Sequence, residues 1–266
     1  GKGTDMDMPV TIGNDQIIDM EPTRYYQTLG IPIKGKGEIP PSHKYLESST
    51  LANLTNASED LTISARHALL QMIEYLVKEQ FAGMKFKIGG MSPEDDVKRF
   101  RRARAVGGDD FRIAVDANQG YTVPDAITFS HLVREDNLLW FEEPCQWQND
   151  RRAMRDVRFA GGVAVCAGQS EFSAAGCRDL METASIDYCN FDSSWSGGPT
   201  EWRKVAAMAT VYDVKMAHHE EPQASSHLLA SIPHGTYMEF FHPMRDPIWH
   251  NMIANRPQLN SGYFQL

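Results

Sequence analysis

The sequence predicts an α/β protein built as a TIM-type (β/α)7β-like barrel, and three observations lead to this prediction. Short apolar runs with the pattern of buried parallel strands alternate with segments of helical periodicity. Most of these runs end in, or are soon followed by, Lys, Asp, Glu or His. The length of 266 residues matches the roughly 250 residues of one such barrel. Because all strands of a barrel end at the same mouth, these polar side chains should gather there.

The strands are predicted from short apolar runs bounded by polar or turn-forming residues. The clearest, Phe-Arg-Ile-Ala-Val, ends at Asp116 and has the composition of a parallel strand buried on both faces. The weakest is the first run, which is short. The predicted strands cover residues 50–54, 84–88, 111–116, 138–142, 163–167, 188–192, 214–218 and 238–241.

A helix is predicted after each strand except the last. The first is capped by residues 58–60 and carries apolar residues at helical spacing through Val77. Pro93 and Pro124, each followed by acidic residues, open the next two helices. The others are predicted over 151–159, 174–183, a segment reaching Met208, and 223–231. The resulting division is an irregular lead-in or remnant at 1–49, the barrel at 50–246 and a C-terminal tail at 247–266.

Composition excludes several classes of protein. A formal charge of −9 argues against a nucleic-acid-binding surface, which would be basic. No apolar run approaches the roughly 20 residues that a membrane span requires. No secretory signal precedes the fold, and none of the four cysteines forms a CxxC pair. We therefore expect a cytoplasmic enzyme with reduced thiols, acting on a small molecule without a nucleic-acid or membrane partner.

The strand ends bear the candidate functional residues. Any one of them could simply open a turn, but a polar residue recurs at the ends of successive predicted strands along the chain. The residues are Lys85 and Lys87, Asp116, Glu142, Glu171, Asp192, His218 and His219, and Glu239.

These residues resemble those of the enolase superfamily, in its mandelate racemase-like subgroup. The resemblance rests on the motifs KFK at 85–87, VDANQ at 115–119, FEEP at 141–144, AGQSE at 167–171, NFDSS at 190–194, HHEEP at 218–222 and MEFF at 238–241. Each motif is weak alone, and their order on successive strand ends carries the resemblance over roughly 83–246.

The resemblance implies a Mg²⁺ ion held by Asp116, Glu142 and Glu171. The chemistry of the donors agrees, because three hard carboxylates suit Mg²⁺ better than Zn²⁺. Two alternatives stay open. Glu143 could replace Glu142 within the FEEP motif. A neighbour could replace Glu171, because this strand end reads Ala-Gly-Gln-Ser-Glu where the family more often has the acid directly after Gly.

The resemblance also implies two groups that move protons. Lys87 resembles a general base whose pKa is lowered by the nearby charges of Lys85 and the metal. His219, oriented by Asp192, resembles the opposite base or acid. His218 makes the choice ambiguous by one residue, since alternation along a strand places only one of the two inward.

Glu239 resembles the family's electrophilic acid, a protonated carboxyl that donates to a substrate carboxylate. A Glu in an apolar strand must be neutral or paired. Asn118 and His218 are assigned to substrate binding.

Together these groups imply abstraction of the proton α to a carboxylate through an enediolate. We favour dehydration of an aldonate or aldarate to a 2-keto-3-deoxy acid by a lyase of the acid-sugar dehydratase type. The alternative enzyme is a racemase or epimerase of a 2-hydroxy acid, because bases on both faces of the substrate permit either outcome.

Members of the family carry an α+β capping domain that closes over the barrel mouth. With about fifty residues before the barrel, this sequence is expected to lack most of that domain. Either the sequence is part of a longer protein that carries the domain, or the third possibility holds, a cap-less, non-catalytic barrel that binds Mg²⁺. We also expect a homo-oligomer.

Overall fold

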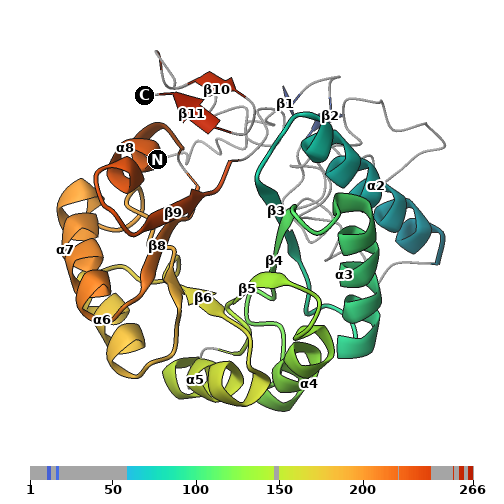
Figure 1. Ribbon diagram of the computed structural model, residues 1–266, viewed down its shortest axis with the longest axis horizontal. Coiled ribbons are helices and arrows are strands. Elements are labelled where there is room, and N and C mark those ends of the chain that lie inside the picture. The colour runs from blue at the N-terminus through green and yellow to red at the C-terminus, as the bar shows by residue number, and fades with distance from the viewer. Residues whose placement is uncertain are drawn as a thin grey trace, which may run out of the picture.

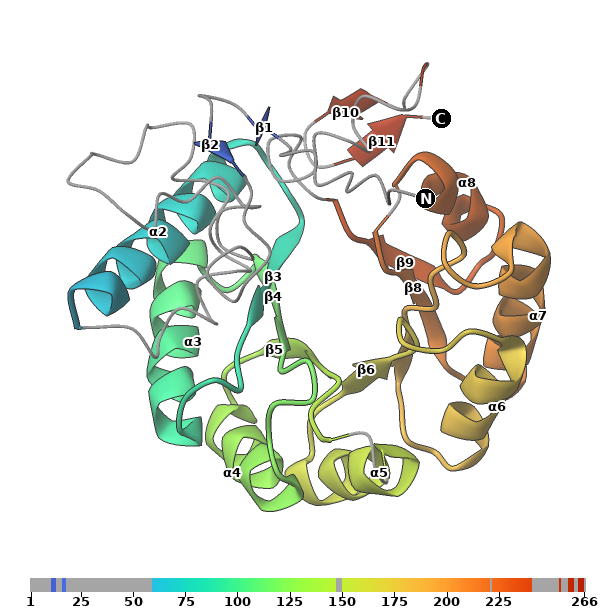
Figure 2. The ribbon, with the colours of Figure 1, turned by 180° about the vertical axis from the view of Figure 1, so that it is seen from behind.

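The structure, a computed structural model, describes residues 59–146, 150–220 and 222–240, with short segments at 11–12, 16–17, 254, 258–260 and 263–265. Its main feature is a curled parallel sheet with helices around its outer side (Figures 1 and 2). The predicted barrel class is confirmed over the described strands. The predicted first strand, at 50–54, lies outside the described residues.

Seven strands form the sheet, in the order in which they occur in the chain, and every neighbouring pair is parallel. Each strand therefore requires a return segment on the outside of the sheet, which the helices supply. The strands are β3 (Gly83–Lys87), β4 (Arg112–Asp116), β5 (Leu138–Glu142), β6 (Val165–Ala167), β7 (Tyr188–Cys189), β8 (Lys215–His218) and β9 (Gly235–Met238).

Helices alternate with these strands, and two of them begin as the sequence predicts. The hydroxyl of Ser92 accepts a hydrogen bond from the backbone of Asp95, and Thr122 caps the following helix in the same way through Asp125. Among the described helices, none is long and apolar enough to cross a membrane. The helices are α2 (Glu59–Lys78), α3 (Pro93–Gly107), α4 (Val123–Val133), α5 (Asp150–Gly161), α6 (Ala174–Glu182), α7 (Gly198–Val211) and α8 (Pro222–Ala230).

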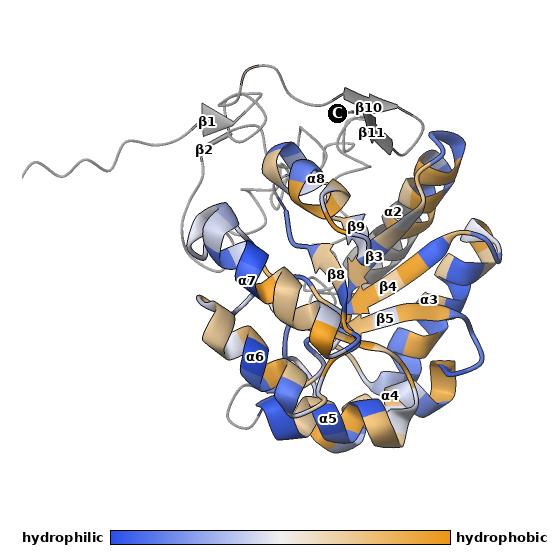
Figure 3. Ribbon diagram, turned by 60° about the vertical axis from the view of Figure 1, so that its left-hand side comes forward, coloured by the Kyte–Doolittle hydropathy of each residue, from blue (hydrophilic) through white to orange (hydrophobic). Residues whose placement is uncertain are grey.

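Side-chain alternation along each strand separates two apolar cores. On β4, Ile113 and Val115 join the large core between sheet and helices, whereas Ala114 belongs to a small cluster inside the barrel. Figure 3 shows how apolar β4 and β5 are, beside helices of mixed hydropathy. The inner cluster consists of Ala114, Trp140, Cys166, Tyr188 and Ala217. This alternation decides which strand-end residues point inward.

The two ends of the sheet approach each other. Phe81, just before β3, lies with its ring centroid 6.1 Å from that of Phe240, just after β9. A Lys85–Glu239 ion pair joins the same two ends inside. The sheet is therefore curled far enough for its first and last strands to share one site.

Most predicted boundaries agree with the structure to within three residues. The last strand is shifted as a whole, because β9 occupies 235–238 instead of 238–241. Two antiparallel strand pairs lie outside the sheet, β1 (Thr11–Ile12) with β2 (Gln16–Ile17) and β10 (Gln258–Asn260) with β11 (Tyr263–Gln265). The division at 1–49, 50–246 and 247–266 stays a prediction.

Candidate active site

A cluster of two lysines and two carboxylates lies at the carboxyl ends of β3, β4 and β5. Lys87, Asp116 and Glu142 are neighbours in register across the three strands. The ammonium of Lys87 lies 2.5 Å from Asp116 Oδ2, and that of Lys85 lies 2.6 Å from Glu142 Oε1 and 3.5 Å from Asp116 Oδ2. Both carboxylates are fully buried. The predicted pair of inward lysines and two of the three predicted metal ligands thus lie together.

Glu239 extends this cluster from the other end of the sheet. Its Oε1 contacts the ammonium of Lys85, and its Oε2 lies 3.6 Å from Nε2 of His219. The backbone N–H of Glu239 also donates to the carbonyl of His218, which continues the β8–β9 pairing by one step. Glu239 therefore lies between a lysine of β3 and the histidine that follows β8.

The charges of this cluster shift its pKa values. Burial raises the pKa of Glu142 to about 7, because the pairing with Lys85 offsets only part of the cost of burying the charge. Although burial opposes the charge of Glu239 too, Lys85 and His219 lower its pKa to about 2. Glu239 is therefore an ionised, paired carboxylate in this structure, which differs from the protonated acid expected from the sequence.

A histidine–aspartate pair faces this cluster. Nδ1 of His219 lies 2.9 Å from Oδ2 of Asp192, and Oδ1 of Asp192 accepts from the backbone and hydroxyl of Ser194. An ionised Asp192 can only accept, so Nδ1 carries the proton and Nε2 is the nitrogen directed at Glu239. The ring of Trp195 contacts that of His219 edge-on, at 5.1 Å between centroids. Although burial opposes the charge, Glu239 and Asp192 raise the pKa of His219.

His218 does not face the site. It is 1% exposed, its Nε2 accepts from the backbone of Ser193, and its Nδ1 lies 2.7 Å from the carbonyl of His219. Its ring stacks on Trp202 of α7. This placement contradicts the expectation that His218 binds substrate. It agrees with the argument that only one histidine of the pair points inward.

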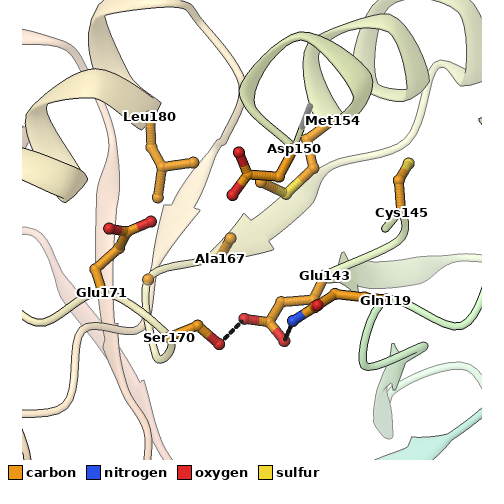
Figure 4. Close-up of a pocket in the computed structure, with 10 residues that line it drawn as sticks. Gln119, Glu143, Cys145, Asp150, Met154, Ala167, Ser170, Glu171 and Leu180 are labelled. Atoms are coloured by element: carbon orange, nitrogen blue, oxygen red, sulfur yellow. Dashed lines mark hydrogen bonds between the residues drawn. The ribbon is translucent and has the colours of Figure 1, made fainter. Parts of the chain in front are cut away.

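Glu171, the expected third metal ligand, is not brought to Asp116 and Glu142. Its backbone N–H donates to the carbonyl of Gly168, and this turn directs its side chain outward. There its Oε1 lies 2.5 Å from the guanidinium of Arg151 on α5. In Figure 4 its carboxylate lies on the side of Leu180 of α6. Within the described residues, the one close group of possible metal ligands is Asp192, His219 and Glu220.

Glu143 accepts hydrogen bonds from four side chains around it. Asn118, Gln119 and Gln169 donate through their amide nitrogens, and Ser170 donates through its hydroxyl at 2.5 Å (Figure 4 shows two of these bonds). Asn118 therefore lies at the barrel mouth, and its amide is bound to Glu143. Its backbone N–H donates to Oδ1 of Asp116, which ties this network to the carboxylate cluster.

Sequence reasoning did not assign Gln169 to the site. It is 7% exposed, its backbone N–H donates to Asn190, and its Oε1 is buried without a hydrogen-bond partner. The signal that could have found it is its position directly after Gly168 at the end of β6.

Comparison with known proteins identifies the family to which this fold belongs. A family described as "Enolase C-terminal domain-like" matches residues 68–266. The chain belongs to this family. Together with its relatives, the match confirms the enolase superfamily and the mandelate racemase-like subgroup that the motifs indicated.

A solved mandelate racemase/muconate lactonizing enzyme from a marine actinobacterium, in complex with magnesium, is similar to this enolase-family chain. It is 59% identical, with a TM-score of 0.71, and the match covers 74% of this chain and 55% of that one. Among curated relatives, 3,6-anhydro-alpha-L-galactonate cycloisomerase of Streptomyces coelicolor is 33% identical over 60% of this chain and 44% of its own. Arabinonate dehydratase of Saccharolobus solfataricus is 30% identical, and the match covers 54% of this chain and 39% of the dehydratase. The chain thus spans less than half the length of these two curated relatives.

Proposed function

We propose that this enolase-family barrel removes the proton α to the carboxylate of a small sugar acid and expels the β-hydroxyl. The product is a 2-keto-3-deoxy acid, and the enzyme is a Mg²⁺-dependent lyase. The observation that carries the proposal is the position of Glu239, between the lysine pair of β3 and the His219–Asp192 pair. Groups able to move protons therefore flank one place at the barrel mouth.

The donor set fits Mg²⁺. Asp116 and Glu142 supply buried, hard oxygen donors that come from adjacent strands in register. Burial raises the pKa of Glu142, and a divalent cation beside this carboxylate would favour its ionised form. Bound Mg²⁺ would stabilise the negative charge that develops on the substrate carboxylate.

Two groups of the chain divide the proton transfers. Lys87 Nζ takes the α-proton. His219 is suited to the opposite role, because its raised pKa favours the imidazolium near neutral pH, and its Nε2 can give that proton to the departing hydroxyl. Asp192 holds the ring in the required tautomer. Trp195 covers one edge of the same ring.

The relatives support a sugar-acid substrate, since one acts on an anhydrogalactonate and another on arabinonate, as their names state. Lys87, at the end of β3, and His219, directly after β8, also suit a second candidate. If His219 gives its proton to the α-carbon of the substrate instead of to the departing hydroxyl, the same residues racemise or epimerise a 2-hydroxy acid.

A panel assay tests the proposal. The chain is incubated with Mg²⁺ and a series of aldonic and aldaric acids, and the keto product is measured. We expect one or a few acids to give a keto acid, and chelation of Mg²⁺ to abolish it. Inversion of a 2-hydroxy acid without keto product would select the racemase. No turnover of any acid by a correctly folded, Mg²⁺-binding protein would favour the non-catalytic barrel. The cytoplasmic location and the homo-oligomer stay predictions.

A further inference from the structure

The proposed cation site has two carboxylates at neighbouring strand ends and needs a third protein oxygen. Asp116 and Glu142 lie together, but the next strand end carries no acid aimed at them. Glu171 is turned into the helix layer, where its Oε2 lies against the backbone of Gly176 so closely that a Cβ there would be 1.7 Å away. Moving this carboxylate to the barrel mouth would break its ion pair with Arg151 and the turn to Gly168.

Gln169 has the properties that Glu171 lacks. Its side chain is more than nine-tenths buried at the end of β6, between residues that follow β5 and β7. Its Nε2 is 3.1 Å from Oε2 of Glu143, so the amide is held by one end only. Its Oε1 is buried and has no hydrogen-bond partner. A buried carbonyl oxygen without a partner is unfavourable, and a cation is one kind of partner that removes this cost.

Glu143 connects the amide group of Gln169 to the carboxylate cluster. The same Oε2 that accepts from Gln169 also accepts from the amide of Asn118, whose backbone N–H donates to Asp116. An ionised carboxylate can accept a hydrogen bond only from the NH₂ group of an amide. The contact with Glu143 therefore leaves the carbonyl oxygen of Gln169 as the end of the amide without a partner. Such outer contacts set the orientation of metal ligands in many proteins.

We propose that Gln169 Oε1, and not Glu171, is the third protein oxygen for the divalent cation held by Asp116 and Glu142, and that Glu143 is the positioning residue for its amide. The inference rests on the proposed function only in assuming that the barrel binds Mg²⁺. A carbonyl oxygen is a hard, neutral donor, so it suits Mg²⁺ while leaving the site one negative charge short of three carboxylates. The site should therefore bind Mg²⁺ more weakly than a site with three acids would.

The test is calorimetric titration of Mg²⁺ into the whole chain and its variants, which needs no substrate. Gln169→Met keeps the length of the side chain and removes both polar atoms. We expect it to weaken Mg²⁺ binding roughly tenfold or more, the size seen when metal-site support is lost. Glu143→Gln should weaken binding in the same direction by releasing the amide. Glu171→Gln, the matched control, should bind as the unmodified protein does.

Gln169→Glu adds a second criterion that does not depend on loss. It supplies the missing charge but replaces a donor to Glu143 with a second carboxylate. We expect lower thermal stability without Mg²⁺, and a larger stabilisation on adding Mg²⁺ than the unmodified protein shows. This variant also keeps the inference testable if Gln169→Met fails to fold, which circular dichroism reports.

The outcomes separate the two proposals. Loss of binding in Glu171→Gln with normal binding in Gln169→Met would overturn this inference and leave the proposed function intact. Normal binding in both would place the third donor elsewhere and also overturn it. Absence of Mg²⁺ binding in the unmodified protein, or normal binding in Asp116→Asn, would instead overturn the proposed cation site itself.

Discussion

The ammonium of Lys85, on the first strand of the described sheet, contacts the carboxylate of Glu239, one residue beyond the last strand. This contact spans the junction where the curled sheet closes, and it lies within the cluster that contains Asp116 and Glu142. Closure of the sheet and assembly of the candidate site are thus the same physical event.

Proton exchange should separate the roles of Lys87 and His219. Exchange of the substrate α-proton with deuterated solvent needs the base alone, whereas loss of the hydroxyl also needs an acid. We expect Lys87→Ala to lose both activities, and His219→Asn to lose keto-acid formation while keeping part of the exchange, measured by NMR. Lys98→Ala, an exposed lysine on α3, is the matched control and should change neither. Exchange that survives in the double variant would remove both residues from the mechanism.

Mg²⁺ should stabilise the folded protein through Asp116. A ligand that binds the native state alone adds about 2.7 kcal/mol to the free energy of unfolding at one hundred times its dissociation constant. We expect an increase of this size in the unmodified protein, and none in Asp116→Asn, by urea unfolding with and without Mg²⁺. Asp156→Asn, a half-exposed aspartate on α5, should respond like the unmodified protein. Equal stabilisation of Asp116→Asn would show that the cation binds elsewhere.

The His219–Asp192 pair should make stability depend on pH in a predictable direction. The pKa of His219 is raised in the folded state, so the folded protein binds the proton more tightly than the unfolded chain does. This stabilisation is complete below the ordinary histidine pKa of about 6.5 and is lost as the pH rises through the raised value. The lowered pKa of Asp192 contributes stability above its ordinary range, which is lost in acid.

The measurement is the free energy of unfolding of the unmodified protein minus that of His219→Gln, across neutral pH. We expect this difference to decrease as the pH rises from about 6 upward. A difference that grows with pH would mean that burial, and not the carboxylates, dominates the environment of His219.

Gly83 should be required for the pairing of β3 with β4. A Cβ on Gly83 would lie 2.1 Å from the backbone oxygen of Arg112, which cannot move without disturbing the next strand. We expect Gly83→Ala to cost about 2–3 kcal/mol or more in unfolding free energy. Gly108→Ala has open space around its Cβ, so its cost, about 1–3 kcal/mol, comes only from a backbone at φ 75° and ψ 177°, a region that favours Gly. Equal costs for the two variants would contradict the clash at β3–β4.

The sequence predicts side-chain direction most accurately for residues that follow the alternation of a strand. Asp116 and Glu142 lie at the last positions of β4 and β5, two residues after the inward Ala114 and Trp140, so their inward direction follows from a period of two. The choice of His219 over His218 follows from the same rule. These residues are found inside the barrel even though the pairing of β4 with β5 and of β8 with β9 shifts register before the strand ends.

Residues beyond an irregular strand end could not be placed in this way. After β6, Gly168 has a φ of 140°, and the turn from Gly168 to Glu171 breaks the alternation. The resemblance, and not strand alternation, assigns Glu171 to the site, and the turn leaves its side chain beside Arg151 of α5. The protonation of Glu239 was also beyond the sequence, because it depends on Lys85, which is distant along the chain.

The contact between Lys85 and Glu239 has a consequence for how the protein is made. A chain emerges from the ribosome in order, so β3 is exposed well before β9 exists, an interval of about eight seconds or more at 5–20 residues per second. During that time the lysines and carboxylates of β3 to β5 must remain hydrated or be paired without Glu239. Docking of β9 is thus the step that turns a nascent open sheet into a closed pocket. A slow or failed last step would leave an intermediate with charged groups at an unfinished edge, the state that chaperones would have to protect.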